Sequence, residues 1–202
     1  MHLALISPES EEPRERRILK ALFTAGLTRY HVRRPGWDSA KVRRWLMAAP
    51  ATWRSSLVLH GHPDLAREFG LAGVHWGEAT APLNPPPQPA PSRACHTPEA
   101  LEKALGHYAA VLYSPVFESL SKPGHAPGKA TGLDRIPRIL AARRGAAKNT
   151  TVYALGGMTS ENLATAAGLG FDGAAVLGSV WHAADPVAAF KGLQEAMLRH
   201  AA

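Results

Sequence analysis

The chain has 202 residues, of which 46% are hydrophobic and 19% are charged. This balance is typical of a globular protein with a buried core and excludes a disordered chain. No apolar run approaches the roughly 18 to 20 residues of a membrane-spanning helix, and the acidic stretch after the short apolar N-terminus is unlike a signal peptide. The single cysteine, Cys95, excludes a disulfide within the chain and a cysteine metal cluster. We therefore expect a cytoplasmic protein without a membrane partner.

Basic residues outnumber acidic ones by 23 to 16, which gives a formal net charge of +7. They occur in short groups separated by apolar positions, and no helix-turn-helix, zinc-finger or aromatic ribonucleoprotein pattern accompanies them. We therefore expect no nucleic-acid partner. The excess of positive charge suits a phosphorylated small molecule instead. The sequence does not fix the oligomeric state and leaves a homo-oligomer open.

Short apolar runs alternate with amphipathic stretches along the whole chain. In the first amphipathic stretch, Ile18, Leu19 and Leu22 share one face of a helix, and Gly26 is suited to end it. The pattern predicts strands at 3–7, 29–33, 56–60, 73–76, 93–96, 108–114, 150–157 and 173–179. It predicts helices at 11–25 and 39–49, after Pro63, after a cap at Thr97, and at 133–144, 159–168 and 185–199.

Residues 79–92 interrupt this alternation with six prolines. Proline fixes its backbone angle and lacks an amide donor, so the segment predicts an extended surface loop, with a partner-binding proline motif as the alternative. The alternation continues in phase beyond it, which argues against a domain boundary. Eight strand–helix units predict a parallel sheet and match the count of a closed barrel. We predict one domain, 1–202, with the α/β architecture of a single (β/α)8 TIM barrel; the alternative is an open doubly wound sheet.

In such a barrel the active site lies at the carboxyl ends of the strands. Histidine, glycine and basic residues gather after the predicted strands, whereas the starts of the strands show no such enrichment. Those after the second to fourth strands are His31, Arg33, Arg34, His60, His62 and His75; those after the sixth are Ser119, Ser121 and Lys122; those after the last two are Gly156, Gly157, Gly178 and Ser179.

Two glycine turns indicate a phosphate site. Gly156-Gly157 and Gly178-Ser179 each follow an apolar strand and precede a predicted helix, where unobstructed backbone amides can hold an anion. Phosphate often binds after strands seven and eight of a barrel. Lys122 can add charge to such a site. The alternative is that both turns only connect strands to helices and that the lysine is solvated.

The histidines are compatible with three different roles. His60 and His62 are two residues apart and face the same side of an extended segment, so with His31 and His75 they could form a metal site. Neutral imidazoles could equally bind a phosphate or a heterocycle through hydrogen bonds. Any one of them could also have a purely structural role.

Several segments, in order and with matching spacing, resemble the thiamine phosphate synthase and TenI family across nearly the whole chain. They are "LVLHGHPDLAREFGLAGVHWG", "ACHTPEAL", "YSPVFESLSKPG", "VYALGGMTSENL" and "GAAVLGSVW". The resemblance implies a barrel that joins hydroxymethylpyrimidine diphosphate to thiazole phosphate and releases pyrophosphate. It implies Mg²⁺ to hold the pyrophosphate and no organic cofactor. The implied partners are thus the phosphorylated thiazole and the pyrimidine diphosphate.

The resemblance also assigns residues. Lys122 matches a pyrophosphate-binding lysine, Gly157 matches a glycine whose amide binds the thiazole phosphate, and Arg33 matches the arginine after strand two. We predict Arg33, Lys122 and His31 as catalytic, and His60, His62, His75, Ser119, Ser121, Gly157, Gly178 and Ser179 as substrate-binding residues.

The chain departs from the family pattern where magnesium is expected. A family Asn-Asp pair is His60-Gly61 here, and a second aspartate is Thr80, so both metal carboxylates are missing and the metal is left unassigned. Glu78 and Asp64 are the acids nearby. Magnesium prefers oxygen ligands, so either Arg33, Arg34, Lys122 and the histidines bind pyrophosphate or coupling is lost.

Two alternatives follow from these departures. One is a thiazole tautomerase of the TenI type, although Pro115 stands where that branch has a histidine and His31 replaces a family glutamine. Such an isomerase needs a proton carrier, which one of the histidines could supply. The other is a non-catalytic protein that binds thiazole phosphate.

Overall fold

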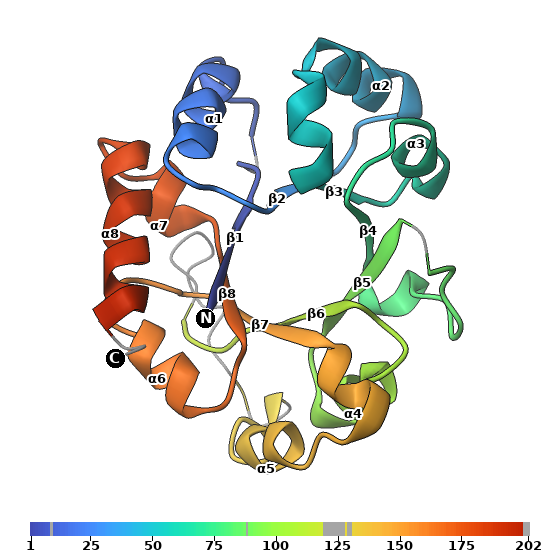
Figure 1. The fold of residues 1–202 in the computed structure, drawn as a ribbon, viewed down its shortest axis with the longest axis vertical. Helices are drawn as coiled ribbons and strands as arrows, with labels where there is room; N and C mark the ends of the chain where they lie inside the picture. Colours follow the sequence, from blue (N-terminus) through green and yellow to red (C-terminus); the bar gives the residue numbers. More distant parts are fainter. Residues whose placement is uncertain (9, 88, 119–127, 129–130, 200–202) are drawn as a thin grey trace.

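A computed structural model describes residues 1–8, 10–87, 89–118, 128 and 131–199 of the chain. Eight parallel strands follow one another in chain order around a closed barrel, and β1 pairs with β8 to close it (Figure 1). The predicted (β/α)8 barrel is therefore confirmed. The strands are β1 (His2–Ile6), β2 (Tyr30–Val32), β3 (Leu57–His60), β4 (Gly73–Trp76), β5 (Ala90–Cys95), β6 (Ala110–Tyr113), β7 (Thr151–Leu155) and β8 (Gly173–Val176).

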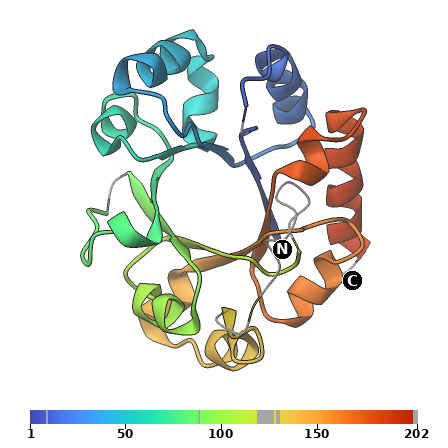
Figure 2. The ribbon, with the colours of Figure 1, turned by 180° about the vertical axis from the view of Figure 1, so that it is seen from behind.

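Helices surround the barrel, as both ribbon views show (Figures 1 and 2). The helix after β8 that ends the described chain contacts the first helix and so completes the ring. The α-helices are α1 (Glu15–Thr24), α2 (Ser39–Ala48), α3 (Pro63–Glu68), α4 (Pro98–Ala104), α5 (Ile136–Ala141), α6 (Leu163–Gly168), α7 (Gly178–Trp181) and α8 (Pro186–Arg199). Short 3₁₀ helices occupy Ala51–Ser56, Glu78–Thr80 and Gly145–Asn149. Within the described ranges, no helix is long and apolar enough to cross a membrane.

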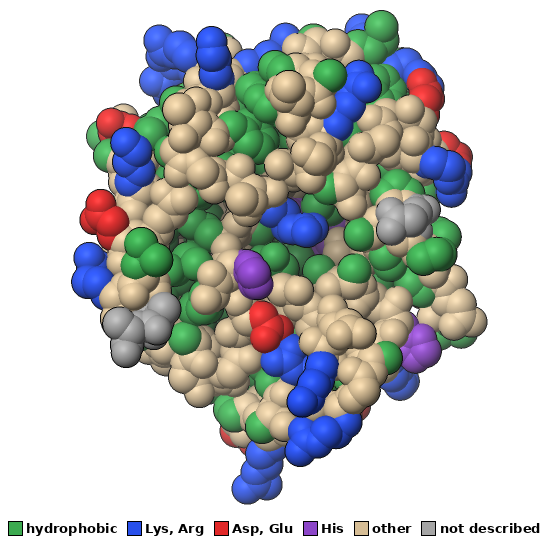
Figure 3. Space-filling view, in the orientation of Figure 1, with side chains coloured by type: hydrophobic (Ala, Val, Ile, Leu, Met, Phe, Trp, Pro, Cys, Tyr) green, Lys and Arg blue, Asp and Glu red, His purple; other side chains and the backbone are tan. Residues whose placement is uncertain are grey.

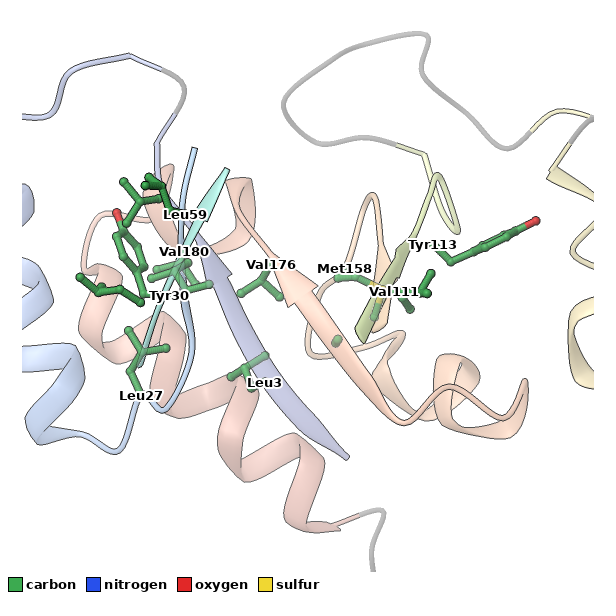
Figure 4. Close-up of a cluster of buried hydrophobic side chains, with 14 of the residues drawn as sticks. Leu3, Leu27, Tyr30, Leu59, Val111, Tyr113, Met158, Val176 and Val180 are labelled. Carbon is green, nitrogen blue, oxygen red and sulfur yellow. The ribbon is translucent and has the colours of Figure 1, made fainter. Parts of the chain in front are cut away.

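The hydrophobic core has an outer and an inner layer because strand residues alternate in direction. The outer layer lies between the strands and the helices and includes Tyr30, Leu59 and Val176, which Figure 4 shows among their neighbours. The inner layer fills the barrel along β6, β7, β8 and β1. Its members are small or aliphatic apart from one tyrosine: Ala4, Ile6, Ala110, Leu112, Tyr153 and Ala175.

The proline-rich segment is shorter than predicted. Strand β5 begins at Ala90, so Pro91 and Ser92, which we expected in the loop, belong to the barrel. Proline is tolerated close to the start of a strand, where few ladder hydrogen bonds are lost, and the carbonyl of Pro91 still accepts from Ala109. This correction brings the Ser92 side chain into the barrel wall.

Two further elements differ from the sequence prediction. Helix α6 begins at Leu163 rather than at 159, because residues 159–162 form a turn that Asn162 closes with its side chain. The segment after β8 forms the short helix α7, which the sequence analysis left as part of a strand and a loop. On the face shown in Figure 3, lysine and arginine side chains lie in separate groups, most of them near the edge and one near the centre, and form no continuous basic stripe.

Candidate active site

Three histidines from neighbouring strands meet inside the barrel. His31 follows Tyr30 in β2, and His75 follows Val74 in β4; the neighbours Tyr30 and Val74 point to the outer layer, so these histidines point inward. His60 ends β3 and pairs in register with His75. The ring centroids of His60 and His75 are 4.2 Å apart, and those of His31 lie 5.3 and 5.6 Å from them. The predicted proximity of these three residues is therefore confirmed.

Hydrogen bonds fix the orientation of two of these rings. The Ser92 hydroxyl donates to the Val74 carbonyl at 3.1 Å, so it accepts from His75 Nδ1 at 3.0 Å. His75 is thereby held with its proton on Nδ1 and a bare lone pair on Nε2. His31 Nδ1 lies 3.1 Å from His60 Nε2, and one of these nitrogens donates to the other. His31 Nε2 is buried and has no hydrogen-bond partner among the described residues.

The histidines are neutral at physiological pH. Burial lowers the pKa of His75 to about 3, and the nearby Arg33 guanidinium acts in the same direction. Burial also lowers the pKa of His31 and His60 well below the usual value, and repulsion from the other imidazoles adds to the effect. Protonated imidazoles would repel one another here, so the cluster presents lone pairs and N–H groups without net charge.

His62 does not join the cluster, and the expectation that it faces the same side as His60 is wrong. The chain leaves β3 through Gly61 and His62, which have φ angles of +70° and +49°. These left-handed conformations break the alternation on which the expectation rested. The ring of His62 instead lies 3.1 Å from the hydroxyl of Ser39, at the start of α2.

The two arginines after β2 have different surroundings. The Arg33 backbone is held by Ser7, whose hydroxyl donates to the Arg33 carbonyl at 2.7 Å and accepts from its amide at 2.9 Å. The Arg33 guanidinium lies close enough to His60 and His75 to lower their pKa values. It therefore belongs to the mouth of the barrel beside the histidines.

The Arg34 side chain is buried in the core between the barrel and the helices. Its guanidinium pairs with Glu15 of α1, which also accepts from the Tyr30 hydroxyl, and both charged side chains are less than a tenth exposed. It also donates to the Pro8 carbonyl at 3.0 Å and stacks over Trp37. Both terminal nitrogens of Arg34 are engaged within the core, whereas its Nε is buried without a partner among the described residues, so this geometry argues against a role for Arg34 in pyrophosphate binding.

The chain after β6 packs directly on the glycine turn after β7. The amide of Val116 donates to the Leu155 carbonyl at 2.9 Å, and the amide of Phe117 donates to the Gly156 carbonyl at 3.2 Å. A Cβ at Gly157, which has a φ of +59°, would come within 2.0 Å of the Glu118 carbonyl oxygen. Glycine is therefore required at 157 for this close approach. Ser119, Ser121 and Lys122 follow next in the chain and lie outside the described residues.

A side chain that the sequence analysis did not single out closes the same turn. Asn162 accepts from the Thr159 amide at 2.9 Å and donates to the Gly157 carbonyl at 2.8 Å. Asn162 thereby engages the carbonyl of Gly157 but not its amide. In the part of the chain that the structure describes, that amide donates no hydrogen bond.

The turn after β8 presents similar groups. Gly178 and Ser179 begin α7, and the Gly178 amide also donates no hydrogen bond to a described residue. The Ser179 hydroxyl is buried and likewise has no partner there. A buried hydroxyl without a partner is unusual in a folded protein and indicates a place for a polar ligand. Because β7 and β8 are neighbours in the barrel, the two turns lie next to each other at its mouth, and together we call them the cup.

Among the described residues, carboxylates for a magnesium ion are not assembled at this mouth. Asp64 is exposed and pairs with Arg67 at 3.1 Å, and Thr80 bonds back to the Gly77 carbonyl. Glu78 accepts from the amide of His96 at 2.8 Å. The described residues therefore do not fit the hard, oxygen-rich coordination that magnesium requires.

Cys95 has no role in this chemistry. Its side chain is fully buried, and burial raises the pKa of the thiol to about 12. Three residues that support the site were missed by the sequence analysis, namely Asn162, Ser7 and Ser92. Ser92 had a detectable signal in its inward register opposite His75, but the surrounding prolines masked the strand.

Comparisons with known proteins show the family of the chain. A family model described as thiamine monophosphate synthase matches residues 3–180. The thiamine-phosphate synthase of Anaeromyxobacter dehalogenans (strain 2CP-C) is 34% identical over 155 residues, which span 73% of this chain and 66% of the relative. That of Laribacter hongkongensis (strain HLHK9) is 28% identical over 194 residues, spanning 88% of this chain and 84% of the relative.

Solved structures are similar over the full barrel. The crystal structure of thiamine phosphate pyrophosphorylase from Bacteroides thetaiotaomicron is 26% identical, covers 98% of both chains and superposes with a TM-score of 0.74. The Pyrococcus furiosus thiamine phosphate pyrophosphorylase superposes with a TM-score of 0.80 at 18% identity, which supports the fold alone.

Proposed function

Because the chain belongs to the thiamine monophosphate synthase family, we propose that it joins hydroxymethylpyrimidine diphosphate to thiazole phosphate and releases pyrophosphate. The observation that carries this proposal is the cup after β7 and β8. There the backbone amides of Gly157 and Gly178 donate no hydrogen bond to a described residue, and the buried hydroxyl of Ser179 has no partner among the described residues. Such donors suit a phosphate dianion.

In this reaction the cup anchors the thiazole phosphate, so that the thiazole nitrogen points across the barrel toward β2, β3 and β4. The bond between the pyrimidine methylene carbon and the diphosphate oxygen breaks, and its electron pair leaves with pyrophosphate. The lone pair of the thiazole nitrogen then forms the new carbon–nitrogen bond. Holding both reactants in line is itself a large part of the catalysis.

Arg33 and Lys122 bind the departing pyrophosphate in this proposal, and Ser119 and Ser121 donate hydroxyl hydrogen bonds to it. Cations aimed at a leaving phosphate stabilise the charge that develops as the bond breaks. The support for Arg33 is its place beside the histidines, whose pKa values it lowers. The support for Lys122, Ser119 and Ser121 is their match to the family motif. No step is assigned to magnesium, because the carboxylates that would hold it are missing.

The histidines form the wall against which the pyrimidine lies. Burial lowers the pKa values of His31, His60 and His75, so they meet the pyrimidine as neutral rings. The same low pKa values make them weak bases at neutral pH, which argues against the thiazole tautomerase.

One assay separates the proposed reaction from its alternatives. Purified protein is mixed with thiazole phosphate and hydroxymethylpyrimidine diphosphate, with and without added Mg²⁺, and thiamine phosphate is followed by chromatography. Formation of thiamine phosphate supports the proposal. Turnover of the carboxythiazole phosphate tautomer alone would identify an isomerase, and binding of thiazole phosphate without any turnover would identify a binding protein.

A further inference from the structure

We propose that His31, His60 and His75 bind one divalent transition-metal ion of the Zn²⁺ class inside the barrel, at the ends of β2, β3 and β4. The proposal concerns the ion alone and does not depend on the reaction that the barrel catalyses.

The geometry of the cluster is close to that of a three-imidazole metal site. One nitrogen from each ring can be chosen so that all three lie within 4.8 Å of one another. Two nitrogens bound to zinc at about 2.0–2.1 Å with a tetrahedral angle are about 3.3 Å apart. His31 Nδ1 and His60 Nε2 are already 3.1 Å apart. The widest pair has to shorten by about 1.5 Å to reach that geometry, which rotations of the imidazole side chains can provide.

The protonation state of the cluster suits a metal. Histidines that bind a metal must be neutral. The N–H of the second ring nitrogen usually donates a hydrogen bond to a fixed acceptor, which orients the ring. His75 has this arrangement, because Ser92 accepts from Nδ1 and in turn donates to the Val74 carbonyl, which leaves Nε2 with a bare lone pair. Burial keeps all three rings neutral.

Packing alone does not explain these side chains. The other half of the barrel interior is filled almost entirely with alanine and aliphatic residues, whereas β2, β3 and β4 contribute imidazoles. His31 and His60 are also two of the positions where the chain departs from the family pattern, and both departures introduce an imidazole.

The donor set selects the class of metal. Imidazole nitrogen suits zinc, copper, nickel and iron, whereas magnesium requires oxygen ligands. The cluster contains no carboxylate. Three protein ligands leave a fourth position open for water or an anion oxygen, as in catalytic zinc sites. The Arg33 guanidinium nearby opposes a dication, so a bound anion would strengthen metal binding.

The test measures Zn²⁺ binding to the full chain, prepared without a polyhistidine tag and stripped with a chelator. Competition with a chromophoric chelator should give one Zn²⁺ per chain, and millimolar Mg²⁺ should not displace it. The variant His60→Gln should weaken binding by roughly 100-fold or more. The matched control His107→Gln, at an exposed imidazole before β6, should leave binding unchanged.

Absence of stoichiometric Zn²⁺ binding, or equal affinity in His60→Gln and the wild type, would overturn the proposal. Circular dichroism establishes that the variant is folded. If it is not, X-ray absorption at the zinc edge of the wild-type protein decides instead. Three imidazole ligands in the zinc coordination shell support the site, and fewer than two overturn it.

Discussion

Replacing Ser179 with alanine should separate ligand binding from stability. The Ser179 hydroxyl is buried and has no partner within the described part of the chain. Removing it takes away no hydrogen bond to a described residue, so stability should stay the same or increase. The cup, in contrast, loses one of its three donors, so affinity for thiazole phosphate should fall.

The magnitudes follow from the burial of this one oxygen. A buried hydroxyl without a partner is destabilising by about 1–3 kcal/mol relative to its hydrated state, so Ser179→Ala should stabilise the unliganded protein by up to about 1 kcal/mol once the small cavity is counted. In a chain of this size that raises the Tm by about 2–4 °C. A hydrogen bond to a charged phosphate contributes about 1.5–3 kcal/mol, which corresponds to a loss of about 10- to 150-fold in affinity.

Calorimetric titration with thiazole phosphate and thermal unfolding without ligand measure the two effects. Ser160→Ala is the matched control, because Ser160 is exposed on the turn after β7 and should change neither quantity. A Ser179→Ala protein that is less stable by more than about 1 kcal/mol and binds thiazole phosphate as tightly as the wild type would refute the reasoning.

Three other substitutions test separate parts of the account. Lys122→Ala should lower the rate of coupling by roughly 100-fold or more and leave the affinity for thiazole phosphate nearly unchanged; equal losses in steady-state kinetics and in binding would contradict its role. Arg34→Met leaves the Glu15 carboxylate buried without its cation and should lower the free energy of unfolding in urea by about 3–5 kcal/mol, with no effect on ligand affinity. Burial opposes ionisation of Asp172, but bonds from Arg143 outweigh it and lower its pKa. Its stabilising effect is therefore present above the unfolded-state pKa near 4 and is lost as the pH falls through the folded-state value. Asp172→Asn should lower the free energy of unfolding at pH 7 and reduce the further loss of stability on going to pH 3. If the urea midpoints of the variant and the wild type differ by the same amount at pH 7 and at pH 3, this explanation is contradicted.

The architecture could be predicted from the sequence because its signals are local and repeat eight times. Each strand is a short apolar run, and helix signals such as the Thr97 cap, whose hydroxyl accepts from the Ala100 amide, stand beside them. The main error in the strands came from proline. Proline indicates a loop in most contexts, yet Pro91 lies near the start of a strand where its missing amide matters little.

The site could be predicted only where the backbone keeps the extended conformation of a strand, in which side chains alternate in direction. His31, His60 and His75 lie in or near the last residues of three neighbouring strands, so the barrel brings them together as expected. His62 does not follow, because two left-handed residues in succession turn the chain away, and no periodicity reports such φ angles. Arg34 also could not be assigned, because its burial against Glu15 depends on a helix that is distant in the sequence.

The most direct test of the central claim is a crystal structure of the chain with thiazole phosphate. The account predicts the phosphate between the ends of β7 and β8, with oxygens about 2.7–3.1 Å from the amides of Gly157 and Gly178 and from the Ser179 hydroxyl. Phosphate density at any other place, with the cup filled by water, would contradict it.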